Sequence, residues 1–136
     1  MLNGLYNIGE AAVASGVTAK MIRHYEEGGL IPKASRTQSG YRLYNDKDVH
    51  MLRFIRHARN LGFSIKRIEE LLDLWRDQDR ESKHVKALAM EHIRELDAKV
   101  DELLSMKSEL QKLIDSCQGN NRPDCPIISR LALNEP

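Results

Sequence analysis

The feature that most constrains this chain is a stretch of 36 residues, 82–117, that contains neither glycine nor proline. As a straight α-helix, such a run would extend about 54 Å. Apolar side chains recur along it in steps of four and three residues, at positions 89, 93, 96, 100, 103, 110 and 114. Lys107 interrupts this apolar seam, and Cys117 ends it. The spacing is typical of a coiled coil, because one apolar stripe faces a partner helix while the charged faces stay in water.

The residues outside this predicted helix are too few to cover its whole apolar seam. We therefore expect the seam to pack against the same helix of a second chain, which predicts a homodimer. The alternative is that the helix packs back onto its own domain, and the small size of the N-terminal part disfavours this arrangement.

Charge is distributed unevenly between the two halves of the chain. Residues 1–62 carry nine Lys and Arg against five Asp and Glu, a net charge of +4, whereas residues 63–136 carry a net charge of −3. A basic half suits a polyanionic partner such as DNA, and an acidic, helical half suits self-association.

The sequence has no pattern typical of export or membrane insertion. Its first residues lack a basic stretch followed by an apolar one, and no apolar run approaches the ~20 residues that cross a bilayer. We therefore expect a cytoplasmic protein without a membrane partner, in which cysteine thiols stay reduced.

Residues 8–27 predict two short helices joined by a tight turn, which is the pattern of a helix-turn-helix. The first helix stops near Gly16. Thr18 is the expected N-cap of the second helix, residues 19–27, and Gly28 ends it. A generic helical hairpin has the same pattern, so spacing alone leaves both interpretations open.

The second helix of this pair has the side chains expected of a recognition helix. Lys20, Arg23 and His24 fall on one helical face. Long donors on such a face can reach phosphates and base edges. Met21 and Tyr25 offer apolar and aromatic contacts beside them. A solvated basic face is the simpler alternative.

Residues 36–44, RTQSGYRLY, predict a short β-hairpin that lies against the helices, and we call these residues the wing. Ser39 and Gly40 are typical of a hairpin turn, and the alternating residues that follow are typical of a strand. Arg36 and Arg42 flank the turn, where they can bind backbone phosphates. Combined with the helix-turn-helix, the wing favours DNA binding.

Two further helices are predicted before the long one. Asn45 is expected to cap the third, which Gly62 ends, and Ser64 is expected to cap the fourth. Both have an apolar stripe at helical spacing, which is typical of helices packed on a shared core. Arg53 and Arg56 on the third helix are interpreted as solvated side chains, with contact to the DNA backbone as the alternative. Trp75 on the fourth helix is interpreted as a packing residue.

Both cysteines of the chain lie in one polar segment, CQGNNRPDCPII, residues 117–128. Cys117 ends the apolar seam, and residues 119–121 turn the chain. Cys125 is the expected N-cap of a short final helix with Pro126 in its first position. A thiol at the positive end of a helix has a lowered pKa. Two thiolates on one loop therefore form a candidate metal chelate.

The donors of this segment favour a soft, monovalent ion. The segment contains no histidine, and Asp124 is its only carboxylate. Two sulfurs satisfy a d10 ion such as Cu(I), Ag(I) or Au(I) in linear coordination, whereas zinc prefers four ligands. Two thiolates and a +1 ion leave a net charge of −1, which a helix N-terminus offsets. The alternative is a redox pair that forms a reversible Cys117–Cys125 disulfide.

On these residues, the chain resembles the MerR family of transcription regulators, and within it the copper-responsive, CueR-like branch. The resemblance rests on the segments NIGEAA, SGVTAKMIRHYEEGGLI, SGYRLY and RHARNLGFS, on the long helix and on the C-x7-C-P-I-I spacing. It extends over nearly the whole chain.

The resemblance implies a mainly α fold. Its parts are an N-terminal winged helix-turn-helix with a short β-hairpin wing, a long antiparallel coiled-coil dimerisation helix, and a C-terminal metal-binding loop followed by a short helix. The implied boundaries are residues 1–76 for the DNA-binding domain, 77–116 for the hinge and dimerisation helix, and 117–136 for the metal-binding loop and C-terminal helix.

The resemblance also implies a mechanism. A dimer of this family binds a promoter whose spacer is too long for RNA polymerase, and metal binding lets the protein bend and untwist the DNA so that the promoter elements align. The regulated genes would serve copper efflux, with Cu(I), or its relatives Ag(I) and Au(I), as the signal. Nothing in the sequence assembles a nucleophile with a base, so no enzyme activity is predicted.

Individual residues match the family's functional positions. In the second helix these are Lys20, Arg23 and Tyr25, in the wing Arg36, Tyr41, Arg42 and Tyr44, and at the metal site Cys117 and Cys125. Thr18, Met21 and His24 complete the predicted DNA-binding set. The chain departs from the family pattern at MLNGLY, a longer start than is typical, and at His24, which replaces a more usual aromatic residue.

Ser82 bears on the choice of metal. In an antiparallel dimer the end of one long helix lies near the start of the other, so Cys117 is expected near Ser82 of the partner subunit. In relatives that sense divalent ions, the matching position is a cysteine. Because serine supplies no thiolate, the resemblance implies a two-coordinate site that is selective for +1 ions.

Overall fold

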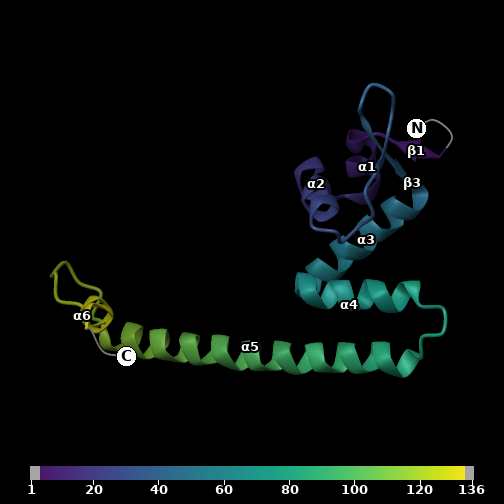
Figure 1. Cartoon of the computed structure of the whole chain (residues 1–136). Coiled ribbons are helices and arrows are strands. Elements are labelled where there is room, and N and C mark those ends of the chain that lie inside the picture. The colour runs from purple at the N-terminus through teal and green to yellow at the C-terminus, as the bar shows by residue number, and fades with distance from the viewer. Residues whose placement is uncertain (1–3, 134–136) are drawn as a thin grey trace. The chain divides into compact units, whose positions relative to one another are not determined.

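The computed structural model describes residues 4–133 (Figure 1). The fold of this range is mainly helical with a small antiparallel sheet, as predicted. In chain order the elements are β1 (Leu5–Tyr6), α1 (Ile8–Ser15), α2 (Ala19–Glu27), β2 (Ser35–Arg36), β3 (Arg42–Asn45), α3 (Asp46–Asn60), α4 (Ile65–Arg76), α5 (Ser82–Ser116) and α6 (Pro126–Ala132). They belong to two compact units, residues 1–85 and 86–136. Over the described range, no helix is long and apolar enough to cross a membrane.

Helices α1 and α2 form the predicted helix-turn-helix pair, and side chains cap both. Asn7 accepts a hydrogen bond from the main-chain N–H of Glu10, whose carboxylate accepts one from the N–H of Asn7 in return. Thr18 accepts from the N–H of Met21 at 3.2 Å, which confirms the predicted cap of α2. These caps fix where each helix begins and so how α2 leaves the turn.

The turn between α1 and α2 depends on a glycine. Gly16 has a φ of 76°, in the left-handed region, and a Cβ atom there would lie 2.9 Å from the guanidinium carbon of Arg56. Gly9, inside α1, has room for a side chain, because the nearest atom to a Cβ built there would be Asn7 Oδ1 at 3.4 Å.

We expect Gly16→Ala to lower the free energy of unfolding of the N-terminal unit by about 1–2 kcal/mol, since the left-handed conformation strains an L residue. Gly9→Ala is the matched control and should raise stability by roughly 0.5 kcal/mol, because alanine favours helix over glycine. Thermal unfolding followed by far-UV circular dichroism compares the two variants. Equal midpoints would contradict the role of the turn.

Strand β3 lies at the centre of the sheet, between β1 and β2. The predicted wing hairpin is present: Arg36 pairs with Arg42, and the loop projects beyond the helices of its unit (Figure 1). Strand β1 was not predicted. Its Tyr6 pairs with Tyr44, and the Tyr6 hydroxyl donates to Asp46 at 2.8 Å. Two residues are too few to produce an alternating pattern, so β1 could not be predicted from the sequence.

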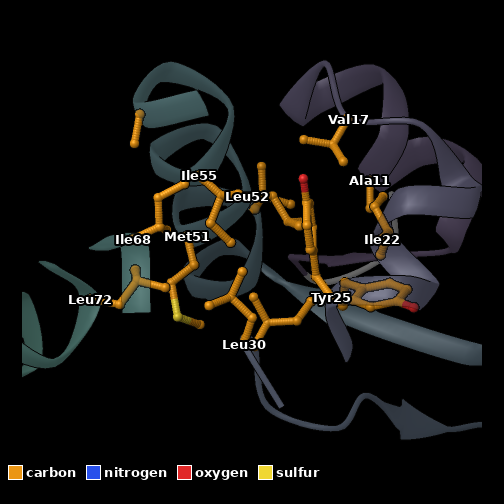
Figure 2. Packing of buried hydrophobic residues seen from close by; sticks show 14 residues of the cluster. Ala11, Val17, Ile22, Tyr25, Leu30, Met51, Leu52, Ile55, Ile68 and Leu72 are labelled. Atoms are coloured by element: carbon orange, nitrogen blue, oxygen red, sulfur yellow. The ribbon is translucent and has the colours of Figure 1, made fainter. Parts of the chain in front are cut away.

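The core of the N-terminal unit forms where the inner faces of its helices meet β3 (Figure 2). Its buried members are Ala11, Val17, Ile22, Tyr25, Leu30, Ile31, Tyr44, Val49, Met51, Leu52, Ile55, Ala58, Ile68 and Leu72. Trp75 of α4 stacks on Phe54 of α3 with ring centroids 5.5 Å apart, which confirms its predicted packing role. Because Ile22 and Tyr25 anchor α2 by one face, the opposite face of α2 is left at the surface.

Helix α5 runs unbroken for 35 residues, as the absence of glycine and proline predicts. Its apolar seam is open to solvent in the single chain: the large seam side chains range from 38% exposed at Leu96 to 58% at Leu103. His92 is the residue of α5 that the structure describes as buried. Such a long exposed apolar stripe is characteristic of a protein interface.

Candidate metal-binding loop and DNA-binding surface

The loop between α5 and α6 brings the two cysteines together. The Sγ atoms of Cys117 and Cys125 lie 3.3 Å apart. Both residues are half-buried free thiols. We call residues 117–125 the thiol loop. A single ion can contact both sulfurs here, and the linear arrangement predicted for a +1 ion would require them to move about 1 Å apart.

Local structure fixes each cysteine. The N–H of Cys117 donates to the carbonyl of Ile114 at 3.0 Å, so Cys117 continues the last turn of α5. Gly119 then takes a φ of 60° as the chain turns. Cys125 is the N-cap of α6 with Pro126 in the first position, as predicted. The end of one helix and the start of the next therefore hold the two sulfurs.

The surroundings of Cys125 favour its thiolate. The main-chain N–H of Ile128, followed by the Cys117 thiol and the N–H of Ile127, lowers the pKa of Cys125. The first N–H groups of a helix have no partner within the helix, and their partial positive charge stabilises a negative sulfur. The direction of this shift agrees with the one predicted from the position of Cys125, and the thiolate is the form that binds metal.

Polar side chains surround the thiol loop without enlarging its set of metal ligands. A cavity of about 440 Å³ is lined by Cys125 together with Arg122, Asp124 and neighbouring polar residues. Across residues 4–133, no group of three or more His, Cys, Asp or Glu side chains is placed to hold a metal ion. The donors that this loop brings together within one chain are the two sulfurs.

Ser82, the predicted selectivity position, is the first residue of α5 and is exposed. Its hydroxyl is a neutral oxygen donor, which is a poor match for a soft ion that prefers sulfur.

The outer face of α2 carries most of the DNA-binding residues predicted for that helix. Lys20, Arg23 and His24 are exposed, as is the capping residue Thr18, and Met21 is half-buried. The arrangement leaves long basic side chains free to extend into solvent, where a phosphate or a base edge would lie.

The tip of the wing is also exposed. The Arg36 guanidinium donates through Nη1 to the carbonyl of Gly40 at 2.8 Å, which orders its side chain along the hairpin. Tyr41 is 71% exposed, far more than a packed aromatic residue. Arg36 and Tyr41 are therefore accessible to a ligand outside the domain.

Three predicted DNA contacts are placed differently from what the sequence suggested. Tyr25 and Tyr44 are buried in the core, so their side chains pack against the domain instead of facing outward. Arg42 is engaged by acidic neighbours: its Nε lies 2.8 Å from Glu26 Oε1, and its Nη2 lies 3.8 Å from Glu27 Oε1. Spacing along a short strand did not reveal which of its faces is turned toward the core.

Sequence reasoning missed two structural roles of charged residues. Glu26, an acid in a basic segment, is buried against the base of the wing. Arg53 is exposed, as interpreted, and it also donates through Nε to the carbonyl of Ala14 at 3.0 Å, which ties α3 to the end of α1. The only sequence signal for these roles was the position of Glu26, an acid among basic residues, because a buried charge needs a partner of opposite charge.

Comparisons with known proteins agree with this architecture. The family of MerR HTH regulatory proteins matches residues 6–75, and the MerR DNA-binding family matches residues 49–113. The two matches together extend from β1 through most of α5.

Individual relatives match over nearly the whole chain. The chain is 56% identical over 126 residues to heavy metal-dependent transcription regulator 2 of Rhizobium meliloti, covering 93% of this chain and 86% of that protein. It is 40% identical to the transcriptional regulator CueR of Salmonella typhimurium, covering 93% and 91% of the two chains. The crystal structure of a Ralstonia metallidurans transcription regulator in complex with lead(II) matches with a TM-score of 0.80 at 31% identity, covering 93% of this chain and 99% of that one.

The family matches and the extent of these identities agree with the helix-turn-helix, the wing and the long helix described above. The chain belongs to the MerR family of transcription regulators, which are DNA-binding regulators and not enzymes.

Proposed function

We propose that this chain is a metal-responsive transcription activator that binds promoter DNA as a homodimer and responds to Cu(I), with Ag(I) and Au(I) as chemical relatives. The observation that carries the proposal is the 3.3 Å approach of two free thiols, one of them with a lowered pKa, at the end of an apolar seam. Two sulfur donors suit a soft d10 ion of charge +1. Cys117 and Cys125 would hold that ion.

Relatives support a response to metal more broadly than they support copper. One is named as a heavy metal-dependent regulator, another is CueR, and a structural neighbour was solved with lead(II). The preference for Cu(I) rests instead on the donor set, because lead and zinc sites generally use more than two ligands. Ser82 of the partner subunit, if it lies beside the loop, adds no third thiolate.

The proposed DNA contacts come from α2, its N-cap and the wing, and their side chains are exposed except for that of Met21, which is half-buried. They are Thr18, Lys20, Met21, Arg23, His24, Arg36 and Tyr41. Tyr25 and Tyr44 are assigned to packing, because both are buried. Lysine and arginine contacts to phosphates would set the position of the protein, and contacts to base edges would set its sequence preference.

The dimer would form through the apolar seam of α5. Its large side chains are about half exposed in one chain, and pairing with an antiparallel copy would remove them from water. A two-fold dimer places two helix-turn-helix units on two half-sites. Metal binding at the thiol loops would then change how the dimer bends promoter DNA for RNA polymerase, in the bacterial cytoplasm where that DNA lies.

Transcription in vitro from a promoter that the dimer binds, under anaerobic conditions, tests this function. We expect Cu(I) to raise transcript yield, with Ag(I) and Au(I) acting similarly and Zn(II) and Pb(II) having little effect. A protein that binds the promoter but responds to Pb(II) or Zn(II) and not to Cu(I) would refute the assignment of the metal.

A thiol redox sensor is the second candidate, and the same 3.3 Å approach favours it. A peroxide would oxidise both thiols to a disulfide. Hydrogen peroxide would be reduced to two molecules of water, and an alkyl peroxide to one molecule of water and one of alcohol. In that case peroxide would change transcription in the absence of metal, and anaerobic Cu(I) would bind weakly. Comparing the two signals on the same promoter separates the candidates.

Ser82→Cys tests the expected position of this residue in the dimer. If the start of one α5 lies beside the thiol loop of the other, the new thiolate should extend the response to Hg(II) or Zn(II), which accept additional sulfur ligands. Ser105→Cys, in the second half of α5, is the control and should leave the ion profile unchanged. Transcription assays with each ion provide the measurement, and an unchanged profile for Ser82→Cys would count against the antiparallel arrangement.

A further inference from the structure

Glu26 is a buried carboxylate on the recognition helix α2. Its side chain is 6% exposed, whereas that of Glu27, the other acidic residue of this helix, is 69% exposed. A buried charge is costly unless hydrogen bonds and an opposite charge compensate it. The partners of Glu26 therefore indicate what the carboxylate is retained to do.

Those partners lie at the base of the wing, one beside each of its two strands. Glu26 Oε2 accepts from the main-chain N–H of Ala34, immediately before β2, at 2.8 Å. Glu26 Oε1 lies 2.8 Å from Nε of Arg42, the first residue of β3. One carboxylate thus connects α2 to the base of both wing strands, and we call this set of contacts the Glu26 bridge.

The wing needs such a connection. Strand β2 has two residues and strand β3 has four, and a ribbon of this size has little stability of its own. Tyr44 anchors β3 in the core, but Ser35 and Arg36 of β2 are exposed. The Glu26 bridge is the polar link that joins the base of the hairpin to the helix that carries Lys20 and Arg23.

The charge of Arg42 is largely matched within the protein. Its Nε lies 2.8 Å from Glu26 Oε1 as an ion pair without hydrogen-bond geometry, and its Nη2 lies 3.8 Å from Glu27 Oε1. The side chain is 21% exposed. An arginine held between two carboxylates in this way contributes less to phosphate binding than a solvated arginine does. Its charge is already neutralised within the protein, so it would release few of the counterions that are condensed on the DNA.

We propose that Glu26 is a positioning residue for DNA binding: by holding Ala34 and Arg42, it sets the wing at the distance from α2 that lets both elements contact the same duplex. The inference rests on DNA binding by α2 and the wing, and it does not depend on which metal the thiol loop binds. Glu26 itself does not touch DNA, and Arg42 acts through the bridge.

Operator binding by the metal-free dimer tests the proposal. The probe is a duplex selected from random-sequence DNA by the wild-type protein, and affinity is measured by fluorescence anisotropy at several salt concentrations. The variants are Glu26→Gln, Arg42→Gln and the double variant, with Glu27→Gln as the control. Glu27→Gln removes the same charge from the adjacent, exposed position, whose carboxylate lies 3.8 Å from Arg42 Nη2, and it leaves Glu26 with both Ala34 and Arg42.

We expect Glu26→Gln to weaken DNA binding about tenfold, an effect of the size found for residues in direct contact. The dependence of DNA affinity on salt concentration should not change. Arg42→Gln should weaken binding further, because it leaves Glu26 buried without its cation. The double variant should bind more tightly than Arg42→Gln, since neither charge is then unpaired. Glu27→Gln should bind as well as wild type or slightly better. Backbone footprints should lose protection under the wing and keep it under α2.

The competing explanation makes opposite predictions. If Arg42 binds a phosphate directly, Arg42→Gln reduces the salt slope by about 0.9. Glu26→Gln would then free the guanidinium and strengthen binding. Either result overturns the proposal, as does a double variant whose loss of DNA affinity equals the sum of the two single losses.

Failure of the wild-type dimer to select any DNA would instead count against the proposed function. The double variant keeps the test valid if Arg42→Gln fails to fold.

Discussion

Replacing Cys117 with serine should reduce the affinity for Cu(I) by roughly three orders of magnitude, because one of two ligands carries a large share of a binding free energy on the order of 10 kcal/mol. The remaining Cys125 sulfur would bind the ion alone and lose the chelate that the 3.3 Å approach provides. Anaerobic competition against a chelator of known Cu(I) affinity measures the loss. Transcription should become insensitive to copper while metal-free promoter binding stays at the wild-type level.

Ser129→Ala is the matched control for this substitution. Ser129 lies on α6 near the thiol loop and is exposed, so removing its hydroxyl leaves both sulfurs in place. We expect its Cu(I) affinity to equal that of the wild type. If Cys117→Ser also retained wild-type affinity, the ion would have to bind elsewhere, and the thiol loop would not be the metal site.

The second large effect is expected at the apolar seam. Leu103→Glu places a charge near the middle of the stripe that is proposed to pair with a second chain. In the antiparallel arrangement the new carboxylate would face the apolar stripe of the partner chain. Burying an unpaired carboxylate costs several kcal/mol, so the dissociation constant of the dimer should rise by more than a hundredfold. Operator affinity should fall with it.

Ala98→Glu is the control for the seam. Position 98 lies on the opposite face of α5 from positions 96 and 100, it is exposed, and glutamate is a good helix former. This variant should remain dimeric. Sedimentation equilibrium measures both association constants, and a dimeric Leu103→Glu variant would show that α5 does not form the interface.

Those elements that depend on local chemistry were predictable from the sequence. Thr18 and Ser64 cap their helices as expected, because each has a short oxygen side chain three residues before an unpaired N–H. The length of α5 followed from the absence of glycine and proline over 36 residues. The capping position of Cys125 followed from Pro126, which favours the first turn of a helix.

What the sequence could not supply were contacts between distant positions. Nothing in the order of residues pairs Glu26 with Arg42, since their meeting depends on how the wing folds back on α2. The burial of Tyr44 depended on the register of β3, which β1 helps to set through Tyr6. The two sulfurs likewise meet through a loop without a periodic pattern, so their 3.3 Å separation does not follow from residue spacing.

In the proposed function, the thiol loop selects a monovalent ion with two sulfurs. The most direct test of this selectivity is an anaerobic competition titration of the wild-type dimer, in which Cu(I) and Pb(II) are each buffered by a chelator of known affinity. We predict tight binding of one Cu(I) per chain that depends on both Cys117 and Cys125, and Pb(II) binding weaker by orders of magnitude. Tight Pb(II) binding, together with Cu(I) binding too weak to compete with its chelator, would show that the thiol loop does not select a monovalent ion.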